Sequence, residues 1–443
     1  MTKKLLIITY YWPPSGGAGV QRWVKLSKYL PKYGIEPIVL TVDSGSASYQ
    51  DLDPSLNDEV REDLRVIRTR SFEPINWYKR LFGGKDLPSG GFANVGRLTW
   101  KKKLMFALRS NLLIPDPRIG WKNYAYRSAQ KLLRSESIAA ILTTSPPHSV
   151  QLIGNKLKRK TDIPWIVDLR DPWTDIYYYD TLRHSAWSHL RNTRMERAVL
   201  ENGDHFLTVS EDLKQLFCRK TSRPLSTLFN ILPNGFDPED FKEVRAPESN
   251  VFTLVYTGTM AEQYRPQVFF KALKNAIDDL PEIKVELKLI GAFPPMIDAL
   301  IEENQLTEIT RKVDTVPHYE SIDWLMQAHM LLLLIPDVVN AEGILTGKLF
   351  EYLASRRTIL CIGPLLGGAA KILQETRSGR TFTRQDEAGI RQFIKDQMLL
   401  LTSGEWQLLD NSTLIKQYSR DNQAQEVADL ISRLSVRGVS PGH

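Results

Sequence analysis

Two glycine-containing segments of this 443-residue chain have the composition of loops that approach phosphate groups. The first, residues 13–22 (PPSGGAGVQR), lies between an apolar run and a helical pattern, and the second is residues 343–353 (GILTGKLFEYL). Glycines at a helix start leave backbone N–H groups accessible, and the helix dipole adds about half a positive charge there. Both segments therefore predict anion sites, with Gly17 and Gly19 lining the first.

The second segment also carries two charged side chains suited to a nucleotide. Its helix is expected to begin at Thr346 or Gly347, so that Lys348 and the N–H groups converge on one position that fits a diphosphate. Glu351 lies three residues after Lys348 on the same helix face, where its carboxylate can accept two hydrogen bonds from a cis-diol such as ribose. The alternative is an ion pair between Lys348 and Glu351 on a solvated helix.

For the first segment, Asp43 suggests an alternative, because an acid at the end of the second expected strand can bind the ribose of a nicotinamide dinucleotide. The fingerprint of such a site is Gly-x-Gly-x-x-Gly, and Arg22 occupies its third glycine position. A long cationic side chain there is expected to block close packing of helix and strand. A plain tight turn is a further alternative, and the phosphate-approach loop is the favoured interpretation.

Positioning these loops requires parallel strands and helices, and the hydropathy pattern predicts both. Short apolar runs predict strands at residues 3–9, 37–42, 64–69, 139–144, 164–169 and 205–209, and again at 252–257, 285–290, 330–334 and 358–362. Helical patterns occur at 20–33, 100–113, 121–135, 148–160 and 266–280. Successive strand–helix–strand units form right-handed parallel sheets, so the fold class is α/β with two doubly wound, Rossmann-like domains.

The proline-punctuated stretch that begins near residue 232 divides these two sets of elements. The expected organisation is a first domain at 1–235, a linker at 236–250, a second domain at 251–411, a closing helix at 412–435 and a loose tail at 436–443. Open parallel sheets bind ligands at the carboxyl ends of their strands. The expected active site is therefore a cleft where the two sheets face each other.

Composition excludes several other classes of protein. The two cysteines, Cys218 and Cys361, are too few for a disulfide framework or a four-ligand zinc site, which suggests the cytoplasm. The longest apolar runs fall well short of the ~20 residues that span a bilayer. The histidines lack metal-ligand spacing, so neither an essential metal nor a cofactor is expected.

The net charge of +7 is concentrated in one segment. Residues 97–134 hold ten Lys and Arg against a single acid, Asp116. Within this segment the pattern of Trp100, Lys101, Lys102, Lys103 and Arg109 predicts a basic amphipathic helix that suits an anionic membrane surface. The alternative is a helix whose apolar stripe packs on the domain. Nucleic acid is not an expected partner, because no binding module accompanies the charge.

Five segments in their order along the chain resemble the family 4 glycosyltransferases of the GT-B fold, of the bacterial surface-polysaccharide type. They are YYWPPSGGAGVQR, LTVSEDL, PNGFD, YTGTM and TGKLFEYLASRRTIL. The resemblance implies a retaining, metal-independent transfer of a hexosyl-type sugar from a nucleoside-diphosphate donor to a saccharide or polyprenyl-linked acceptor. It also places the donor mainly on the second domain and the acceptor mainly on the first.

Position by position, the resemblance implies roles for several residues. Gly17 approaches the donor phosphates or the reacting centre, Gly258 lines the diphosphate pocket, and Arg265 neutralises the leaving diphosphate together with Lys348. Glu351 matches the second glutamate of the family's Glu-x7-Glu signature. The position of the first glutamate is occupied by Gly343, with Glu342 one residue out of register, which leaves the identity of the sugar open.

A second departure from the family lies at the end of the strand at 164–169, where many members have a histidine and this chain has Arg170 followed by Asp171. The functional interpretation is that one of them orients a sugar hydroxyl or the acceptor, and the alternative is a buried Arg–Asp pair that fixes the strand end. His148 opens a helix after another strand and is expected at the same cleft, although ordinary helix packing also explains it.

Two other functions remain open at this stage. A nucleotide-sugar epimerase of the GT-B fold would act on the donor alone and would need acid and base carboxylates in the cleft. A non-catalytic nucleotide-sugar or membrane-binding protein would bind a donor without turnover, and the absent first glutamate keeps that alternative open.

Overall fold

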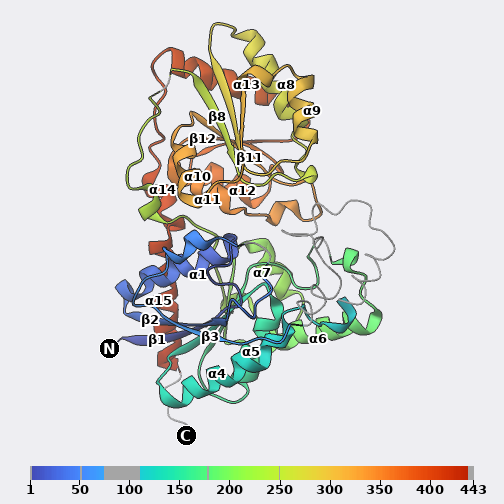
Figure 1. Ribbon diagram of the computed structural model, residues 1–443, viewed down its shortest axis with the longest axis vertical. Coiled ribbons are helices and arrows are strands. Elements are labelled where there is room, and N and C mark those ends of the chain that lie inside the picture. The colour runs from blue at the N-terminus through green and yellow to red at the C-terminus, as the bar shows by residue number, and fades with distance from the viewer. Residues whose placement is uncertain (1, 50–51, 74–109, 177–178, 249, 438–443) are drawn as a thin grey trace. The chain divides into compact units, whose positions relative to one another are not determined.

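The computed structural model describes all residues except 1, 50–51, 74–109, 177–178, 249 and 438–443. The chain forms two compact units, each built around its own parallel sheet (Figure 1). The first unit contains residues 1–233 and 420–443, and the second contains residues 234–419. The chain therefore leaves the first unit after Pro233 and returns to it at Arg420.

The sheet of the first unit has seven parallel strands in the order β3-β2-β1-β4-β5-β6-β7. The strands are β1 (Lys3–Ile8), β2 (Ile35–Val42), β3 (Arg65–Thr69), β4 (Ala140–Ser145), β5 (Trp165–Leu169), β6 (His205–Thr208) and β7 (Phe229–Ile231). The order reverses between β1 and β4, which is where doubly wound sheets bind ligands.

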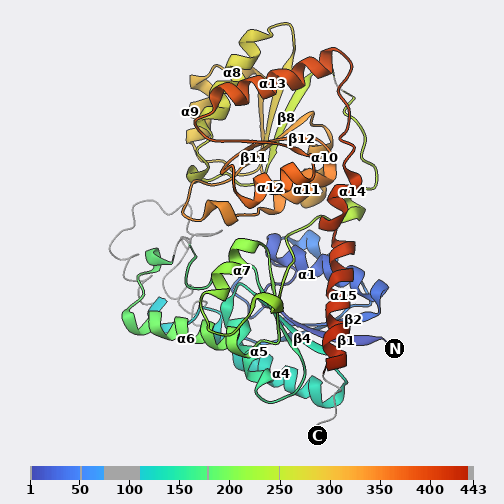
Figure 2. The same cartoon turned by 180° about the vertical axis from the view of Figure 1, so that it is seen from behind.

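Helices cover both faces of this sheet. They are α1 (Ala18–Tyr29), α4 (Lys122–Ser135), α5 (Gln151–Lys158), α6 (Ala186–Asn202), α7 (Glu211–Cys218) and α15 (Arg420–Arg437). One buried cluster joins α1 and α15 to the sheet through residues such as Val24 and Val427, and a second joins α4, α5, α6 and α7 to the opposite face. Figure 2 shows α15 running along the sheet of the first unit.

The second unit repeats the arrangement with six parallel strands in the order β10-β9-β8-β11-β12-β13. They are β8 (Phe252–Thr257), β9 (Val285–Ile290), β10 (Thr310–Val313), β11 (Met330–Leu334), β12 (Thr358–Ile362) and β13 (Gly379–Phe382). The helices are α8 (Gln267–Asp279), α9 (Met296–Glu303), α10 (His318–Met326), α11 (Gly347–Ser355), α12 (Gly368–Glu375), α13 (Glu387–Thr402) and α14 (Ser412–Ile415). One buried cluster holds α8, α9 and α13 on one face, and another holds α10, α11 and α12 on the other.

The predicted α/β class with two Rossmann-like parallel sheets is confirmed. The segment predicted as one closing helix over 412–435 is divided in the structure. Helix α14 ends at Ile415, a 3₁₀ turn follows at Lys416–Tyr418, and Ser419 is extended. At this break, the Tyr418 carbonyl accepts a hydrogen bond from the backbone N–H of Phe236. The carbonyl is thus satisfied by a segment far away in the sequence before α15 begins.

Within the described ranges, no helix has both the length and the apolar character needed to cross a membrane.

Candidate functional site

In the second unit, two glycines make room for a lysine at the carboxyl end of the sheet. Gly258 follows β8 with φ +97°, and a Cβ on it would lie 2.7 Å from Lys348 Cε. Gly291 follows β9 with φ +132°, and a Cβ there would lie 2.5 Å from the Gly258 carbonyl oxygen. Both positions need glycine for conformation and for space. The predicted residues Gly258 and Lys348 are therefore in contact.

Lys348 is held by oxygen atoms and by an aromatic face. Its Nζ donates to Tyr256 Oη at 2.5 Å and to the Thr259 carbonyl at 3.2 Å, and it lies 4.1 Å from the centroid of the Tyr256 ring. Burial lowers the pKa of Lys348 from 10.5 to about 7, and nearby Glu351 opposes the shift. A desolvated ammonium of this kind attracts an anion more strongly than one in water.

The same lysine is the second residue of α11. Thr346 precedes the helix in an extended conformation, and Gly347 is its first residue. Thr346 Oγ1 is buried and has no hydrogen-bond partner among the residues that the structure describes. The orphan backbone N–H groups of the first turn and the Lys348 ammonium thus share one helix start, which is the arrangement that binds phosphate.

Glu351, one turn further along α11, contacts a residue that the sequence interpretation did not include in the site. Its Oε1 lies 2.9 Å from Nε2 of His318, the first residue of α10, and both side chains are mostly buried. Lys348 and Glu351 therefore have different partners, instead of the mutual ion pair considered as an alternative. The sequence signal for His318 is its place directly after Pro317, because proline is common at helix starts.

Arg265 follows Tyr264, whose ring centroid lies 5.7 Å from Lys348 Nζ, at the same edge. It has a left-handed conformation with φ +45°, and its Nη1 forms an ion pair with Asp337 Oδ2 at 2.8 Å. Arg384 approaches the same Asp337 from the strand end after β13, at 3.9 Å. The Arg265 side chain is 63% exposed, so the pair with Asp337 leaves much of the guanidinium accessible to a ligand.

In the first unit, the glycine loop opens onto the end of β5. Gly17 caps α1 with φ +100°, and a Cβ on it would meet nothing within 4 Å. A Cβ on Gly19 would lie 2.3 Å from Nη1 of Arg170, so the guanidinium rests against the loop. The structure therefore brings together Gly19 and Arg170, two predicted residues from segments far apart in the chain.

Arg170 and the residue that follows it, Asp171, are half-buried at this point. Arg170 Nη2 donates to the Pro146 carbonyl at 3.4 Å, and its Nε is buried without a hydrogen-bond partner in the described residues. Burial lowers the pKa of Arg170 and raises the pKa of Asp171, and the attraction between the two charges opposes both shifts. Unsatisfied buried groups of this kind are costly unless a ligand or water completes them.

His148 lies beside this group, where its ring stacks on Trp173 with centroids 4.7 Å apart. Burial lowers the pKa of His148 to about 3, so the imidazole is neutral at physiological pH. Its Nδ1 is buried with no hydrogen-bond partner in the described part of the chain. His148 thus packs as the structural alternative expected, with one buried polar atom that no described residue satisfies.

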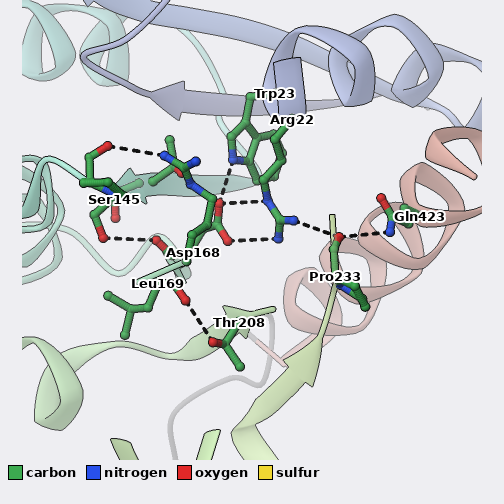
Figure 3. A network of polar contacts seen from close by, with 12 residues as sticks. Arg22, Trp23, Ser145, Asp168, Leu169, Thr208, Pro233 and Gln423 are labelled. Atoms are coloured by element: carbon green, nitrogen blue, oxygen red, sulfur yellow. Dashed lines mark hydrogen bonds and ion pairs between the residues drawn. The ribbon is translucent and has the colours of Figure 1, made fainter. Parts of the chain in front are cut away.

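Figure 3 shows a hydrogen-bonded Arg–Asp pair at this end of the sheet, and it is formed by Arg22 and Asp168. Arg22 donates to the two carboxylate oxygens at 3.2 and 3.1 Å, and Trp23 Nε1 donates to Oδ2 at 2.8 Å. The expectation that Arg22 would block close packing of helix and strand is wrong, because its guanidinium is completely buried against this counter-charge.

Arg22 also donates to the Pro233 carbonyl at 3.0 Å, and Gln423 Nε2 donates to the same oxygen at the same distance (Figure 3). Pro233 is the last residue of the first unit before the chain crosses, and Gln423 follows shortly after its return. The network therefore holds both chain crossings against the glycine-loop helix α1. We assign it a structural role.

Two further predictions bear on partners. Trp100, Lys101, Lys102, Lys103 and Arg109, proposed for a membrane-facing helix, lie outside the described residues. Among the described residues there is no group of three or more His, Cys, Asp or Glu side chains that could hold a metal ion.

Comparison with known proteins identifies the fold. No family model and no curated protein matches the chain. Solved structures do. A glycosyltransferase from Rickettsia africae ESF-5 has 12% identity, covers 98% of each chain and has a TM-score of 0.59. Sucrose-phosphate synthase from Thermosynechococcus elongatus has 13% identity over 98% of this chain and 100% of its own, with a TM-score of 0.57.

The lipopolysaccharide outer core galactosyltransferase WaaB is similar at 12% identity, with coverage of 97% of this chain and 99% of that chain and a TM-score of 0.57. These neighbours share the GT-B fold, in which two Rossmann-like domains follow one another. The chain therefore has the GT-B fold, as the resemblance implied.

Proposed function

We propose that the protein is a glycosyltransferase that moves a sugar from a nucleoside-diphosphate donor to a saccharide or lipid-linked acceptor. The observation that carries this proposal is the arrangement on α11: the Lys348 ammonium against Gly258 at the helix start, and the Glu351 carboxylate one turn later. A cation at a helix N-terminus suits a diphosphate, and a carboxylate a turn away suits the ribose attached to it. The GT-B fold supports the proposal.

The donor is proposed to bind on the second unit. Lys348 and the first turn of α11 bind the diphosphate, with Gly258 allowing its close approach. Glu351 accepts hydrogen bonds from the ribose hydroxyls, and His318 orients that carboxylate by donating to Oε1. Arg265, which is already largely exposed, moves from Asp337 to the diphosphate as charge develops there.

The chemistry follows from this placement of charge. The bond between the anomeric carbon and the phosphate oxygen breaks, and the departing diphosphate is stabilised by Lys348, Arg265 and the helix start. The acceptor oxygen bonds to the anomeric carbon on the face that the diphosphate leaves, and its proton passes to the phosphate oxygen. This route gives retention and needs neither a protein nucleophile nor a metal ion, since the cationic side chains supply the positive charge.

The acceptor is proposed to bind on the first unit, where Arg170, Asp171 and His148 provide polar atoms beside the glycine loop. The Arg170 guanidinium and the neutral imidazole of His148 can each hold a hydroxyl group. A saccharide, free or carried on a polyprenyl lipid, suits this role, and the structurally similar WaaB is a galactosyltransferase of the lipopolysaccharide outer core. The cysteine content suggests that the enzyme works in the cytoplasm.

A ligand panel tests the proposal. Nucleoside diphosphates and nucleotide sugars are added to the full chain, and the melting temperature is measured, since a ligand that binds the native state raises it. At least one nucleoside diphosphate is expected to stabilise the protein, with and without a chelator. Lys348→Ala should remove the shift, whereas Lys371→Ala, on the exposed surface of α12, should retain it.

Donors that bind are then incubated with and without candidate acceptors. Transfer with retained anomeric configuration is expected only when an acceptor is present. Isomerised sugar from the donor alone would instead identify an epimerase, and binding without any turnover would identify a nucleotide-sugar-binding protein.

A further inference from the structure

Charge is divided unequally between the two units. The first unit contains 39 of the 58 Lys and Arg residues and 25 of the 51 Asp and Glu residues, so its net charge is +14. The second unit is left with a net charge of −7. A chain with a total of +7 therefore has one strongly basic half. A basic half attracts anionic surfaces, so the location of its cations matters.

Many of these cations lie on one helical layer. Helices α4, α5 and α6 pack against the same face of the seven-stranded sheet, and their labels follow one another in Figure 1. They contain nine Lys and Arg residues and two acids. Of the acids, Glu196 is buried and paired with Lys220, and Glu201 pairs with Arg197. The outward face of the layer is thus overwhelmingly positive.

The cations of this layer gather without counter-charges. Burial, together with the positive charges of Lys156 on α5 and Arg191 on α6, lowers the pKa of Lys122 on α4. Seven of the nine form no ion pair with any residue that the structure describes: Lys122, Arg127, Lys131, Arg134, Lys156, Arg191 and Arg194. An external anion bound to this cluster reduces the electrostatic repulsion among its cations.

Apolar side chains stand among these cations. On α6, Trp187 is 59% exposed and Leu190 is 47% exposed, and the Arg191 guanidinium lies 5.2 Å from the Trp187 ring centroid. These three residues and Arg194 lie three or four positions apart along α6, so their side chains share one face of the helix. Tyr124 is exposed on α4.

Leu112, 74% exposed, belongs to a segment that is bonded to the start of α6. The Asn111 side chain accepts from the Ser185 backbone N–H at 2.7 Å and donates to the Arg183 carbonyl at 3.2 Å. The apolar contribution therefore comes from two segments rather than from one isolated residue.

We propose that the outward face of α4, α5 and α6 is a docking surface for an anionic lipid bilayer, with Trp187 and Leu190 entering the headgroup region and the unpaired cations contacting lipid phosphates. Exposed Trp and Leu beside Arg and Lys is the composition of interfacial helices. The choice of a bilayer over a soluble polyanion rests on those apolar groups, because a soluble polyanion needs only the cations. The surface complements the proposed function by bringing the enzyme to a lipid-linked acceptor.

Vesicle sedimentation tests this surface with the full-length protein. The protein is mixed with vesicles of phosphatidylcholine alone or with vesicles that also contain phosphatidylglycerol, at low and high salt. Binding at least tenfold stronger to the anionic vesicles is expected, and it should weaken as salt screens the charges. R191E/R194E should reduce partitioning by about 25-fold, which is roughly fivefold for each cation lost. W187A/L190A should reduce it about tenfold.

Matched controls separate this surface from total charge and from folding. R219E/R433E makes the same change of charge at exposed positions on α15 and beyond α7, and should change binding much less. L365A/L366A removes exposed apolar groups from the second unit and should leave binding unchanged. The melting temperature and its nucleotide shift are measured on each sample, so that loss of docking is distinguished from loss of the donor site.

Three results would overturn the proposal. They are equal partitioning of the wild-type protein to neutral and anionic vesicles, equal losses in the α6 and control variants, and unchanged binding in W187A/L190A with strong competition by heparin. The last result would identify a surface for a soluble polyanion. In each case an intact nucleotide shift would leave the proposed glycosyltransferase function standing.

Discussion

The imidazole of His318 and the carboxylate of Glu351 meet at 2.9 Å, although 33 residues separate them in the chain. The contact joins the first residue of α10 to the second turn of α11, on two helices that pack on the same face of the sheet. It orients one carboxylate oxygen and leaves the other for a second donor. Ribose hydroxyls are the donors that we propose for it.

This relationship predicts discrimination between ribose and deoxyribose. Glu351→Ala is expected to weaken binding of the preferred nucleoside diphosphate about tenfold or more, because a hydrogen bond to a charged group is worth about 1.5–3 kcal/mol. His318→Ala should have a smaller effect, and His318→Gln, which can still donate, should recover part of it. Calorimetric titration with the ribo- and 2′-deoxyribonucleotide measures this. A Glu351→Ala variant that still discriminates between them would contradict the assignment.

Adding a methyl group at Gly258 is expected to reduce both the stability of the protein and its affinity for nucleotides. Gly258→Ala introduces strain at φ +97° and drives the methyl group into Lys348 Cε. The strain should cost about 1–3 kcal/mol of unfolding free energy, and nucleotide affinity should fall at least tenfold because Lys348 moves. Gly404→Ala is the matched control, with φ +73° and nothing within 4 Å of its Cβ. It should show the stability loss alone, and a nucleotide effect in Gly404→Ala would contradict the argument.

The lowered pKa of Lys348 predicts that nucleotide affinity depends on pH. The ammonium loses its proton near pH 7 in the free protein, whereas a bound diphosphate favours the charged form and raises the pKa. Binding above pH 7 therefore takes up a proton, and affinity should fall as pH rises from 7 to 9, by up to about tenfold per pH unit. Titrations across this range measure the slope. Lys348→Arg, which stays charged, should flatten the profile, and a wild-type profile that is already flat would refute the mechanism.

The sequence predicted buried strands better than edge strands, for a physical reason. Strands β8, β11 and β12 were predicted with the bounds that the structure has, because each is a compact apolar run that is covered on both faces. Strand β9 was also predicted with its bounds, although Glu286 and Lys288 interrupt its apolar residues. Strand β10 was missed because it reads TRKV, with exposed Arg311 and Lys312, and β7 has three residues. Helix α6 was missed because its inward face carries polar residues, including Ser188, Asn192 and Glu196.

The candidate site could also be predicted only in part from the sequence. Glycines and Lys348 near a helix start are local signals, and the structure brings Gly258 and Lys348 into contact at one edge of the second sheet. The contacts themselves depend on residues brought together by the fold, as with Gly19 and Arg170 or Glu351 and His318. Arg22 shows the same limit most clearly, because its burial is acceptable only with Asp168, which lies 146 residues away.

Because Gly19 contacts Arg170, we expect that substitutions at either residue lower the rate of sugar transfer in the same way. The methyl group in Gly19→Ala would occupy the place of the guanidinium, so the Arg170 side chain must move away. Gly19→Ala and Arg170→Met should each lower the rate of sugar transfer to the acceptor, and the double variant should be hardly worse than Arg170→Met alone. Steady-state rates for the four proteins form the double-mutant cycle. Additive losses would show that Gly19 acts independently of Arg170.

For the buried Arg22–Asp168 pair, removing one partner is expected to destabilise the protein at least as much as removing both. Asp168→Ala removes the acceptor of hydrogen bonds from Arg22, Trp23 and Thr144 and leaves a guanidinium buried without its counter-charge, which should cost about 3–5 kcal/mol of unfolding free energy. R22M/D168L removes both charges and should cost no more than Asp168→Ala. Urea unfolding followed by tryptophan fluorescence measures both variants.

The exposed pair of Arg61 and Asp63 is the control for this comparison. Asp63→Ala should change the unfolding free energy by less than about 1 kcal/mol, because water screens that pair and solvates the remaining arginine. The buried pair also binds the Pro233 carbonyl, so Asp168→Ala should loosen both chain crossings as well as the sheet end. Faster hydrogen exchange at the start of α15 is therefore expected in Asp168→Ala and not in Asp63→Ala, and equal exchange in the two variants would show that the network does not hold the crossings.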